Sequence, residues 1–388
     1  MTTTTVDKPD PAAPRDLLAR PTTRYRGTNI DGPTLAPAEG LWVRGQNLND
    51  LIGHTDFEAA LWHIWFEAMP APAERAAVVD RLAVFGRAFE AGDVAVTAAA
   101  AAGRAGVEMI FAAATGFMRG TDEVRDQAPA PAWDADFDAM LACIAAAPYL
   151  LNAGLGVSRP ALEPAASHAQ RVLHLAGGDA ASPSAVRAMD ALLVAWHAGF
   201  GYVTPTVLVP RVAIGTGVTL SQAIAAGFMS SGPNHVGAAL EAMRWLRRAA
   251  ADAHAVENAA AKVDETLDDP DTLLFGFGHP LFVADPRPPH LRALCTEWGI
   301  AGRHLRLFDA VRDRAKERKG LNPNIDFITA AVLLELGITE PRWGIGVGLC
   351  ARIAAMAAHA IERRRRPAFG VNSATARKLL AAVPVGWL

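Results

Sequence analysis

The chain has 388 residues, of which 51% are hydrophobic and 20% are charged, and its formal net charge is −3. This composition supports a large buried core and excludes extensive disorder, and the length predicts two domains. The charge balance gives no electrostatic reason to expect binding to nucleic acid or to an anionic membrane.

The three cysteines, Cys143, Cys295 and Cys350, are scattered and show no metal-ligand spacing. We expect them to be small core side chains in a reducing compartment, and we expect no bound metal. No apolar run is judged to reach membrane-spanning length, and the N-terminus shows no basic-then-apolar signal pattern. A soluble, cytoplasmic protein is therefore expected.

The first half of the chain predicts a tail followed by helices. Residues 1–26 carry a threonine run and several prolines and predict a mobile tail, and a short strand with a turn is expected at residues 41–45. Asp56 is placed to cap the next helix. Further helices are expected at residues 73–91, 94–115, 135–153 and 163–177, and one that starts at Ser182-Pro183. The alanine-rich stretch 94–115 predicts close helix packing, either in the ordinary core or between subunits.

The second half continues the helical pattern. Helices are expected at residues 238–263, 292–299, 304–319, 327–336 and 343–361, with an acidic turn at residues 264–271. Strand-like alternation is almost absent from the whole chain. The predicted fold class is therefore all-α.

Three segments place a titratable side chain beside a turn set by glycine or proline. They are Gly-Pro-Asn-His at residues 232–235, Gly-Phe-Gly-His-Pro at residues 276–280 and Asn-Pro-Asn-Ile-Asp at residues 322–326. A histidine held in such a loop, as His235 and His279 are, can donate a proton to a substrate oxygen. It can equally be a bystander whose hydrogen bonds are satisfied by water or by the protein.

Two charged residues stand in apolar surroundings. Asp326 either caps the helix that follows it, or is a general base whose basicity is raised by the flanking Ile325 and Phe327. Arg352 is the only charged residue in the stretch 348–357, where the other side chains are small or apolar. A buried arginine needs a carboxylate, and the sequence leaves open whether the protein or a ligand supplies it.

The three segments, in this order and spacing, resemble the citrate synthase family over residues 42–369. The resemblance implies an all-α fold with a large domain, residues 27–231 and 331–388, and a smaller mobile domain, residues 232–330. The cleft between the two domains would hold the site. The family also implies a homodimer in which Arg366 reaches the neighbouring subunit's site.

The resemblance assigns roles to residues that match the family's motifs. Asp326 would remove a proton from the α-carbon of a thioester, His235 would stabilise the enolate oxygen, and His279 would protonate the carbonyl oxygen of a 2-oxo acid. The arginines implied in carboxylate binding are Arg287, Arg352 and Arg366. The coenzyme A thioester is a substrate, with no bound cofactor, and it would be held by Phe275, Gly276, Phe277 and Gly278. Lys316 and Lys319 either meet its phosphates or face water.

The chain departs from the family where the family reads His-x-Asp-His-x-x-Asn. Phe200 replaces the histidine that binds the oxo acid, and Val203 replaces the asparagine. With Tyr202, these residues are expected to set acceptor specificity and to favour an acid less polar than oxaloacetate. The link from His279 to Arg287 is also one residue shorter than in the family.

The predicted activity is an acyltransferase reaction that condenses an acyl-CoA with a 2-oxo acid to give a citrate-like product and free coenzyme A. Acetyl-CoA is the expected acyl-CoA. Two alternatives remain open at this stage. One is a lyase acting on a citryl-CoA-like thioester. The other is a catalytically silent protein that binds coenzyme A or citrate. The replacements at Phe200 and Val203 favour the silent protein, whereas the retained His235, His279 and Asp326 speak against it.

Overall fold

The computed structural model describes residues 40–88, 94–117, 133–160, 162–199, 204–232, 235–279 and 282–364, together with residue 374. The predicted all-α class is confirmed. Within these ranges the only strands are the two-residue β1 (Trp42–Val43) and β2 (Gln46–Asn47), which pair antiparallel. The expected tail at residues 1–26 lies outside the described residues.

The first elements follow the prediction closely. The turn between β1 and β2 is made by Arg44 and Gly45, both at positive φ. It leads into α1 (Leu48–Leu51) and α2 (Phe57–Phe66). Asp56 caps α2 as expected, because its side chain accepts a hydrogen bond from the backbone N–H of Ala59 at 2.9 Å.

Two predicted helices are each broken into two. The stretch 94–115 forms α4 (Val94–Ala102) and α5 (Val107–Phe117), since Gly106 lies at φ 127°, outside the helical region. The stretch 238–263 forms α12 (Ala238–Ala250) and α13 (Ala259–Asp268). Between them the Asp252 side chain accepts hydrogen bonds from the backbone N–H of His254 and from the side chain of Asn258, which stabilises a turn. The acidic segment expected to be a turn is therefore helical up to Asp268.

Close packing of the alanine-rich region is visible in the core. Ala95 and Ala99 are fully buried, and a Cβ on Gly103 would lie 2.0 Å from the carbonyl oxygen of Gly154 in α7. The small residues therefore let the helices approach within one chain. A contact of this region with a second subunit stays a prediction.

Most of the remaining helices occur in the predicted order with shifted ends, whereas no helix was predicted at the positions of α10 and α11. The helix expected from residue 163 begins only at His168, where Ser167 and Gln170 form a capping box, and Ser182 caps the helix it was expected to start. The helices not yet named are α3 (Pro72–Ala88), α7 (Ala135–Leu155), α8 (His168–Ala176), α9 (Pro183–His197), α10 (Pro205–Ile214), α11 (Leu220–Met229), α14 (Arg287–Glu297), α15 (Arg303–Lys319), α16 (Ile325–Glu335) and α17 (Arg342–Arg364).

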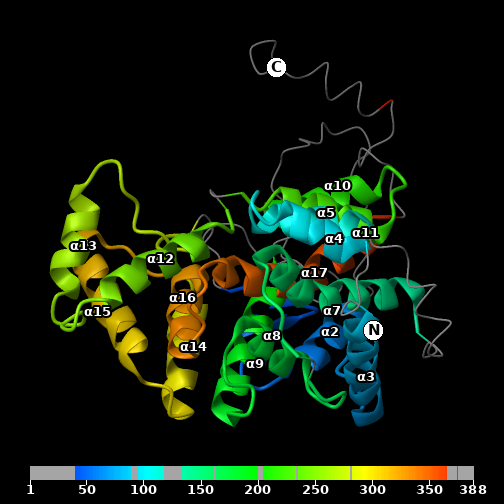
Figure 1. The fold of residues 1–388 in the computed structure, drawn as a ribbon, viewed down its shortest axis with the longest axis horizontal. Coiled ribbons are helices and arrows are strands. Elements are labelled where there is room, and N and C mark those ends of the chain that lie inside the picture. Colours follow the sequence, from blue (N-terminus) through cyan, green and yellow to red (C-terminus); the bar gives the residue numbers. More distant parts are fainter. Residues whose placement is uncertain are drawn as a thin grey trace, which may run out of the picture.

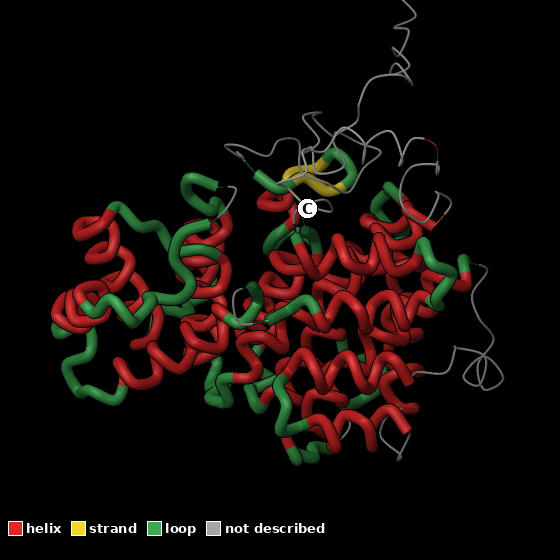
Figure 2. The backbone as a smooth tube through the Cα atoms, turned by 90° about the horizontal axis from the view of Figure 1, so that it is seen from above, coloured by secondary structure: helices red, strands yellow, loops and turns green. Residues whose placement is uncertain are grey.

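Helix α17 is the central element. It is buried along most of its length and contacts α7, α9, α10 and α11 as well as α12 and α16. Helices α12–α16 gather at the left of Figure 1 and most of the other helices lie to their right, and Figure 2 shows a similar division from above. The predicted division into two domains stays a prediction, and its boundary between residues 330 and 331 falls inside α16.

The expectation about apolar runs was wrong. Helices α7 and α17 are each long and apolar enough to cross a membrane, with mean hydropathies of 1.4 and 1.5. Most of each apolar stretch, 78% in α7 and 94% in α17, is buried inside the protein. Core helices share this composition, so it carries no argument for a membrane span. The three cysteines are buried and unpaired, as core side chains.

Candidate active site

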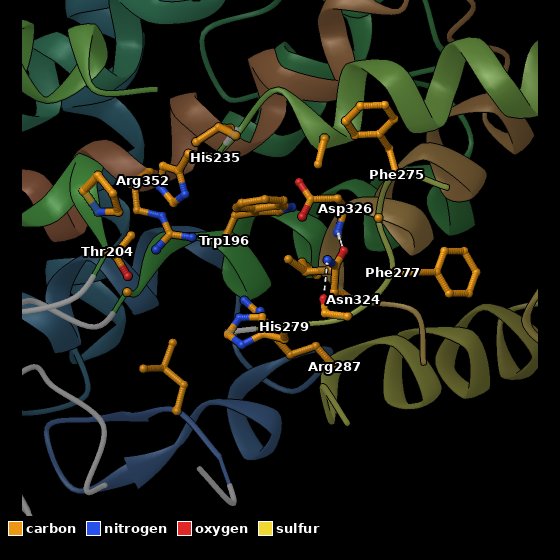
Figure 3. A pocket seen from close by; sticks show the side chains of 18 of the residues that line it. Trp196, Thr204, His235, Phe275, Phe277, His279, Arg287, Asn324, Asp326 and Arg352 are labelled. Carbon is orange, nitrogen blue, oxygen red and sulfur yellow. Dashed lines mark hydrogen bonds between the residues drawn. The ribbon is translucent and has the colours of Figure 1, made fainter. Parts of the chain in front are cut away.

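A cavity of about 560 Å³ lies where the α12–α16 group meets the rest of the chain (Figure 3). It is lined by the predicted catalytic residues His235, His279 and Asp326, although they come from three separate segments. The cavity wall also contains two of the predicted arginines and the whole predicted coenzyme segment, namely Arg287, Arg352, Phe275, Gly276, Phe277 and Gly278.

Not every predicted site residue reaches this cavity. Lys316 and Lys319 are exposed at the end of α15 and do not line it, and the ammonium of Lys319 donates instead to the carbonyl oxygen of Leu267 at 2.6 Å. The remaining predicted residues, Phe200, Tyr202, Val203 and Arg366, lie outside the described residues.

Backbone hydrogen bonds join the loop of His279 to the loop of Asp326. The N–H of Gly278 donates to the carbonyl oxygen of Asn322, and the N–H of Asn324 donates to that of Gly276, both at 2.8 Å. Gly276 has φ 84°, and a Cβ there would lie 2.7 Å from the Cβ of Phe327. Only glycine fits this position without strain, so the glycine of the motif brings the two loops together.

Asn324, and not Asp326, caps helix α16. The Asn324 side-chain oxygen accepts from the N–H of Asp326 at 2.9 Å, and its amide nitrogen donates to the carbonyl oxygen of Gly278 at 2.8 Å (Figure 3). The interpretation of Asp326 as a helix cap was therefore wrong, and its carboxylate lies in the first turn, facing the cavity. Sequence reasoning missed Asn324, whose place two residues before the aspartate was the available signal.

The Asp326 carboxyl group is poised to take up a proton near neutral pH. The side chain is 8% exposed and its Oδ1 has no hydrogen-bond partner among the described residues. Burial raises its pKa from the ordinary 3.8 to about 7, with a smaller contribution from the Asp285 charge, while Arg287 and Arg352 act in the opposite direction. A carboxylate with this pKa is a stronger base than one in water.

Both cavity histidines are neutral at physiological pH. Burial is the main reason that the pKa of each falls to about 4, and the positive charges of Arg287 near His279 and of Arg352 near His235 add to it. The Nδ1 atom of His279 accepts from the N–H of Phe282 at 3.1 Å, so the ring proton lies on Nε2. The Nε2 atom of His235 is buried and has no partner among the described residues. Neutral imidazoles of this kind donate hydrogen bonds to a developing oxyanion.

The two cavity arginines differ in what holds them. Arg287 forms a two-point ion pair with Asp285, with Nε–Oδ1 and Nη2–Oδ2 distances of 2.9 and 2.8 Å, and Asp285 also accepts from the N–H of Ile325 at 3.0 Å. Arg352 is 7% exposed and forms no ion pair within the described part of the chain. The nearby Asp326 carboxylate opposes the lowering of the Arg352 pKa that burial causes, and whether a ligand carboxylate also pairs with Arg352 stays open.

Together these groups suit proton removal from a carbon acid. Asp326 supplies the base, His235 and His279 supply uncharged donors, and Arg352 supplies a cation for an anionic ligand. Across the described ranges, no three His, Cys, Asp or Glu side chains are arranged to hold a metal ion.

Comparison with known proteins identifies relatives of this chain. A sequence model of the family described as citrate synthase, C-terminal domain, matches residues 20–369. Citrate synthase of Haloferax volcanii is 27% identical over 307 residues, which are 76% of this chain and 78% of that protein. Citrate synthase 2 of Bacillus subtilis is 27% identical over 200 residues, 50% of this chain and 52% of that protein.

Solved structures share the fold. The citrate synthase of Thermoplasma acidophilum, in a ternary complex with carboxymethyl coenzyme A and oxaloacetate, aligns with a TM-score of 0.69 at 18% identity, covering 89% of this chain and 93% of that one. The citrate synthase of Pyrobaculum aerophilum aligns with a TM-score of 0.67 at 19% identity, covering 84% and 85%. With a family match that spans most of its length, the chain belongs to the citrate synthase family.

Proposed function

We propose that this protein condenses an acyl-CoA with a 2-oxo carboxylic acid and then hydrolyses the thioester to release free coenzyme A. The observation that carries the proposal is the buried Asp326, with its pKa raised to about 7, in one cavity with two neutral histidines. A thioester α-carbon is a weak acid, so its ionisation needs a base and an oxyanion donor at the same time.

The steps follow from the positions of these groups. Asp326 takes a proton from the α-carbon while His235 donates a hydrogen bond to the thioester oxygen, giving an enolate. The enolate carbon then forms a bond to the carbonyl carbon of the oxo acid, and the Nε2 proton of His279 is given to the oxygen of that carbonyl. The proton that Asp326 has taken up is released to solvent, and His279 regains a proton from solvent. Water finally cleaves the thioester, which yields a carboxylate and the thiol of coenzyme A.

The cavity wall and the sequence support a proposal for the identity of each substrate. We take acetyl-CoA as the acyl donor, held along Phe275–Gly278 with the thioester toward Asp326, and Arg352 as a ligand for the oxo-acid carboxylate. Phe200 and Val203, in place of the family's polar side chains, support an acceptor less polar than oxaloacetate. We further propose a cytoplasmic homodimer to which Arg366 contributes across the subunit interface.

Thiol release tests the proposal. Acetyl-CoA and propionyl-CoA are each incubated with pyruvate, 2-oxobutanoate, 2-oxoglutarate and oxaloacetate, and free thiol is measured against a no-acceptor control. The expected result is thiol release that requires both substrates. Equal thiol release without any 2-oxo acid would indicate a simple thioesterase, and none with any pair, in a protein that still binds coenzyme A, would indicate a silent binding protein.

A further inference from the structure

Arg352 is held in the cavity wall by an aromatic ring. Its guanidinium carbon lies 5.4 Å from the ring centroid of Trp196 at the end of α9. Gly199 makes room for the same group, since a Cβ on this glycine would lie 2.0 Å from Nη1 of Arg352. Figure 3 shows Trp196 between Arg352 and Asp326, and both side chains line the cavity.

Trp196 is itself fixed from two sides. Its indole N–H donates to the hydroxyl of Thr329 at 2.9 Å, and Thr329 is fully buried in α16, one turn after Asp326. On the opposite helix α17, a Cβ on Gly348 would lie 3.2 Å from the Trp196 ring, so the glycine leaves the ring its space. The ring therefore has one well-defined orientation.

The way in which Arg352 is stabilised leaves its hydrogen-bond donors available. An aromatic face attracts a cation by its quadrupole without using the N–H groups. Arg287 is the contrast within the same cavity, because Asp285 already occupies its Nε and Nη2. Among the described residues no side chain accepts from the Arg352 guanidinium, so a carboxylate-bearing substrate would meet a buried cation with available N–H groups and a preset orientation.

We propose that Trp196 is a positioning residue that holds the Arg352 guanidinium ready for the carboxylate of the acceptor acid, with Thr329 fixing the ring. This inference rests on the proposed function, since it names the residue that prepares the acceptor site. Trp196 acts through Arg352, so its loss raises the KM for the acid more than it lowers kcat or changes the KM for the acyl-CoA.

Three substitutions test the inference. Trp196→Leu removes the aromatic face, Trp196→Phe keeps an aromatic face without the N–H, and Thr329→Val removes the hydrogen-bond acceptor with little change of volume. The matched control is Thr266→Val, because Thr266 accepts from the indole of Trp245 at 3.0 Å in the same kind of buried pair, and neither residue lines the cavity. Thermal unfolding and circular dichroism confirm that each variant is folded.

Steady-state kinetics and calorimetric titration with pyruvate, 2-oxobutanoate and oxaloacetate give the readouts. We expect Trp196→Leu to raise the KM and Kd for the acid about tenfold or more, Thr329→Val about threefold to tenfold, and Trp196→Phe less than Trp196→Leu. The KM for the acyl-CoA should change less than about threefold in all of them, as should both constants in Thr266→Val.

The outcomes separate this inference from the proposed function. Equal acid binding by the wild type, Trp196→Leu and Thr329→Val overturns the inference about Trp196. A wild type that binds none of the three acids overturns this inference as well. If Trp196→Leu does not fold, Thr329→Val decides the matter alone. A wild type that binds an acid with the expected dependence on Trp196, yet turns over no acyl-CoA, supports the inference and contradicts the proposed condensation.

Discussion

Replacing Asp326 by asparagine should remove activity and, above neutral pH, stabilise the protein. The Asp326 carboxylate is buried with one oxygen lacking any partner among the described residues, so its ionised form costs free energy in the folded state. An asparagine of the same shape carries no charge to desolvate. The removal of a positioned base should lower kcat by about a hundredfold or more.

The size of the stabilisation follows from the pKa. Burial raises it from the ordinary 3.8 to about 7. A difference of about 3 in pKa corresponds to about 4 kcal/mol in the free energy of unfolding. Below pH 3.8 the carboxyl group is protonated in both folded and unfolded chains, so the cost is absent. It grows as the pH rises from there to about 7, and it is constant at higher pH.

Guanidinium unfolding of the wild type and Asp326→Asn, measured from about pH 5 to pH 8, checks this reasoning. The variant should be more stable at pH 8 by as much as about 4 kcal/mol, and the difference should shrink as the pH falls. Asp80→Asn, which changes an exposed carboxylate in α3, is the control and should show no such trend. An Asp326→Asn protein that is no more stable than the wild type at pH 8 would refute the buried-base argument.

Three further changes have defined outcomes. The kcat/KM for the acyl-CoA should rise about tenfold per pH unit up to about pH 7 and then level off, because only ionised Asp326 accepts the proton; a profile that is flat from about pH 5 to pH 8 would contradict this. Asn324→Ser keeps the helix cap but loses the hydrogen bond to Gly278, so kcat should fall about tenfold with little change in Tm. The control variant Asn322→Ser should leave kcat and Tm unchanged. Equal kinetics for the two variants would count against Asn324 as a link between the loops. Phe200→His should shift the acceptor preference toward oxaloacetate by on the order of a hundredfold in relative kcat/KM, and a wild type that already prefers oxaloacetate would show the expectation to be wrong.

Much of the fold and the centre of the site could be predicted from the sequence. Caps such as Asp56 and Ser182 mark helix starts because their side chains satisfy backbone donors that no other group reaches. The three loops could be found because glycine and proline restrict the backbone in ways that side-chain chemistry then uses. Gly276 is a clear case, with both its positive φ and its contact with Phe327 requiring glycine.

The features that were missed depend on contacts distant in sequence. The Asp252 turn that breaks the long helix into α12 and α13 looks like an ordinary charged helix face until its three-dimensional partners are known. Trp196 reads as one apolar residue among many in α9, and its role emerges only when α9, α16 and α17 are brought together. Arg352 was singled out because an isolated charge in an apolar helix violates the usual pattern. That it forms no ion pair within the described residues could be seen only from the folded structure.

The most direct test of the central claim follows the proton that Asp326 is proposed to remove. The protein is incubated in ordinary water with acetyl-CoA deuterated at its methyl group and with the best 2-oxo acid from the panel. The masses of the products are then measured by mass spectrometry. The account predicts free coenzyme A together with an adduct of acetyl group and oxo acid that has lost one deuteron, formed by the wild type and not by Asp326→Asn. Coenzyme A released without any adduct, or an adduct formed equally well by Asp326→Asn, would contradict it.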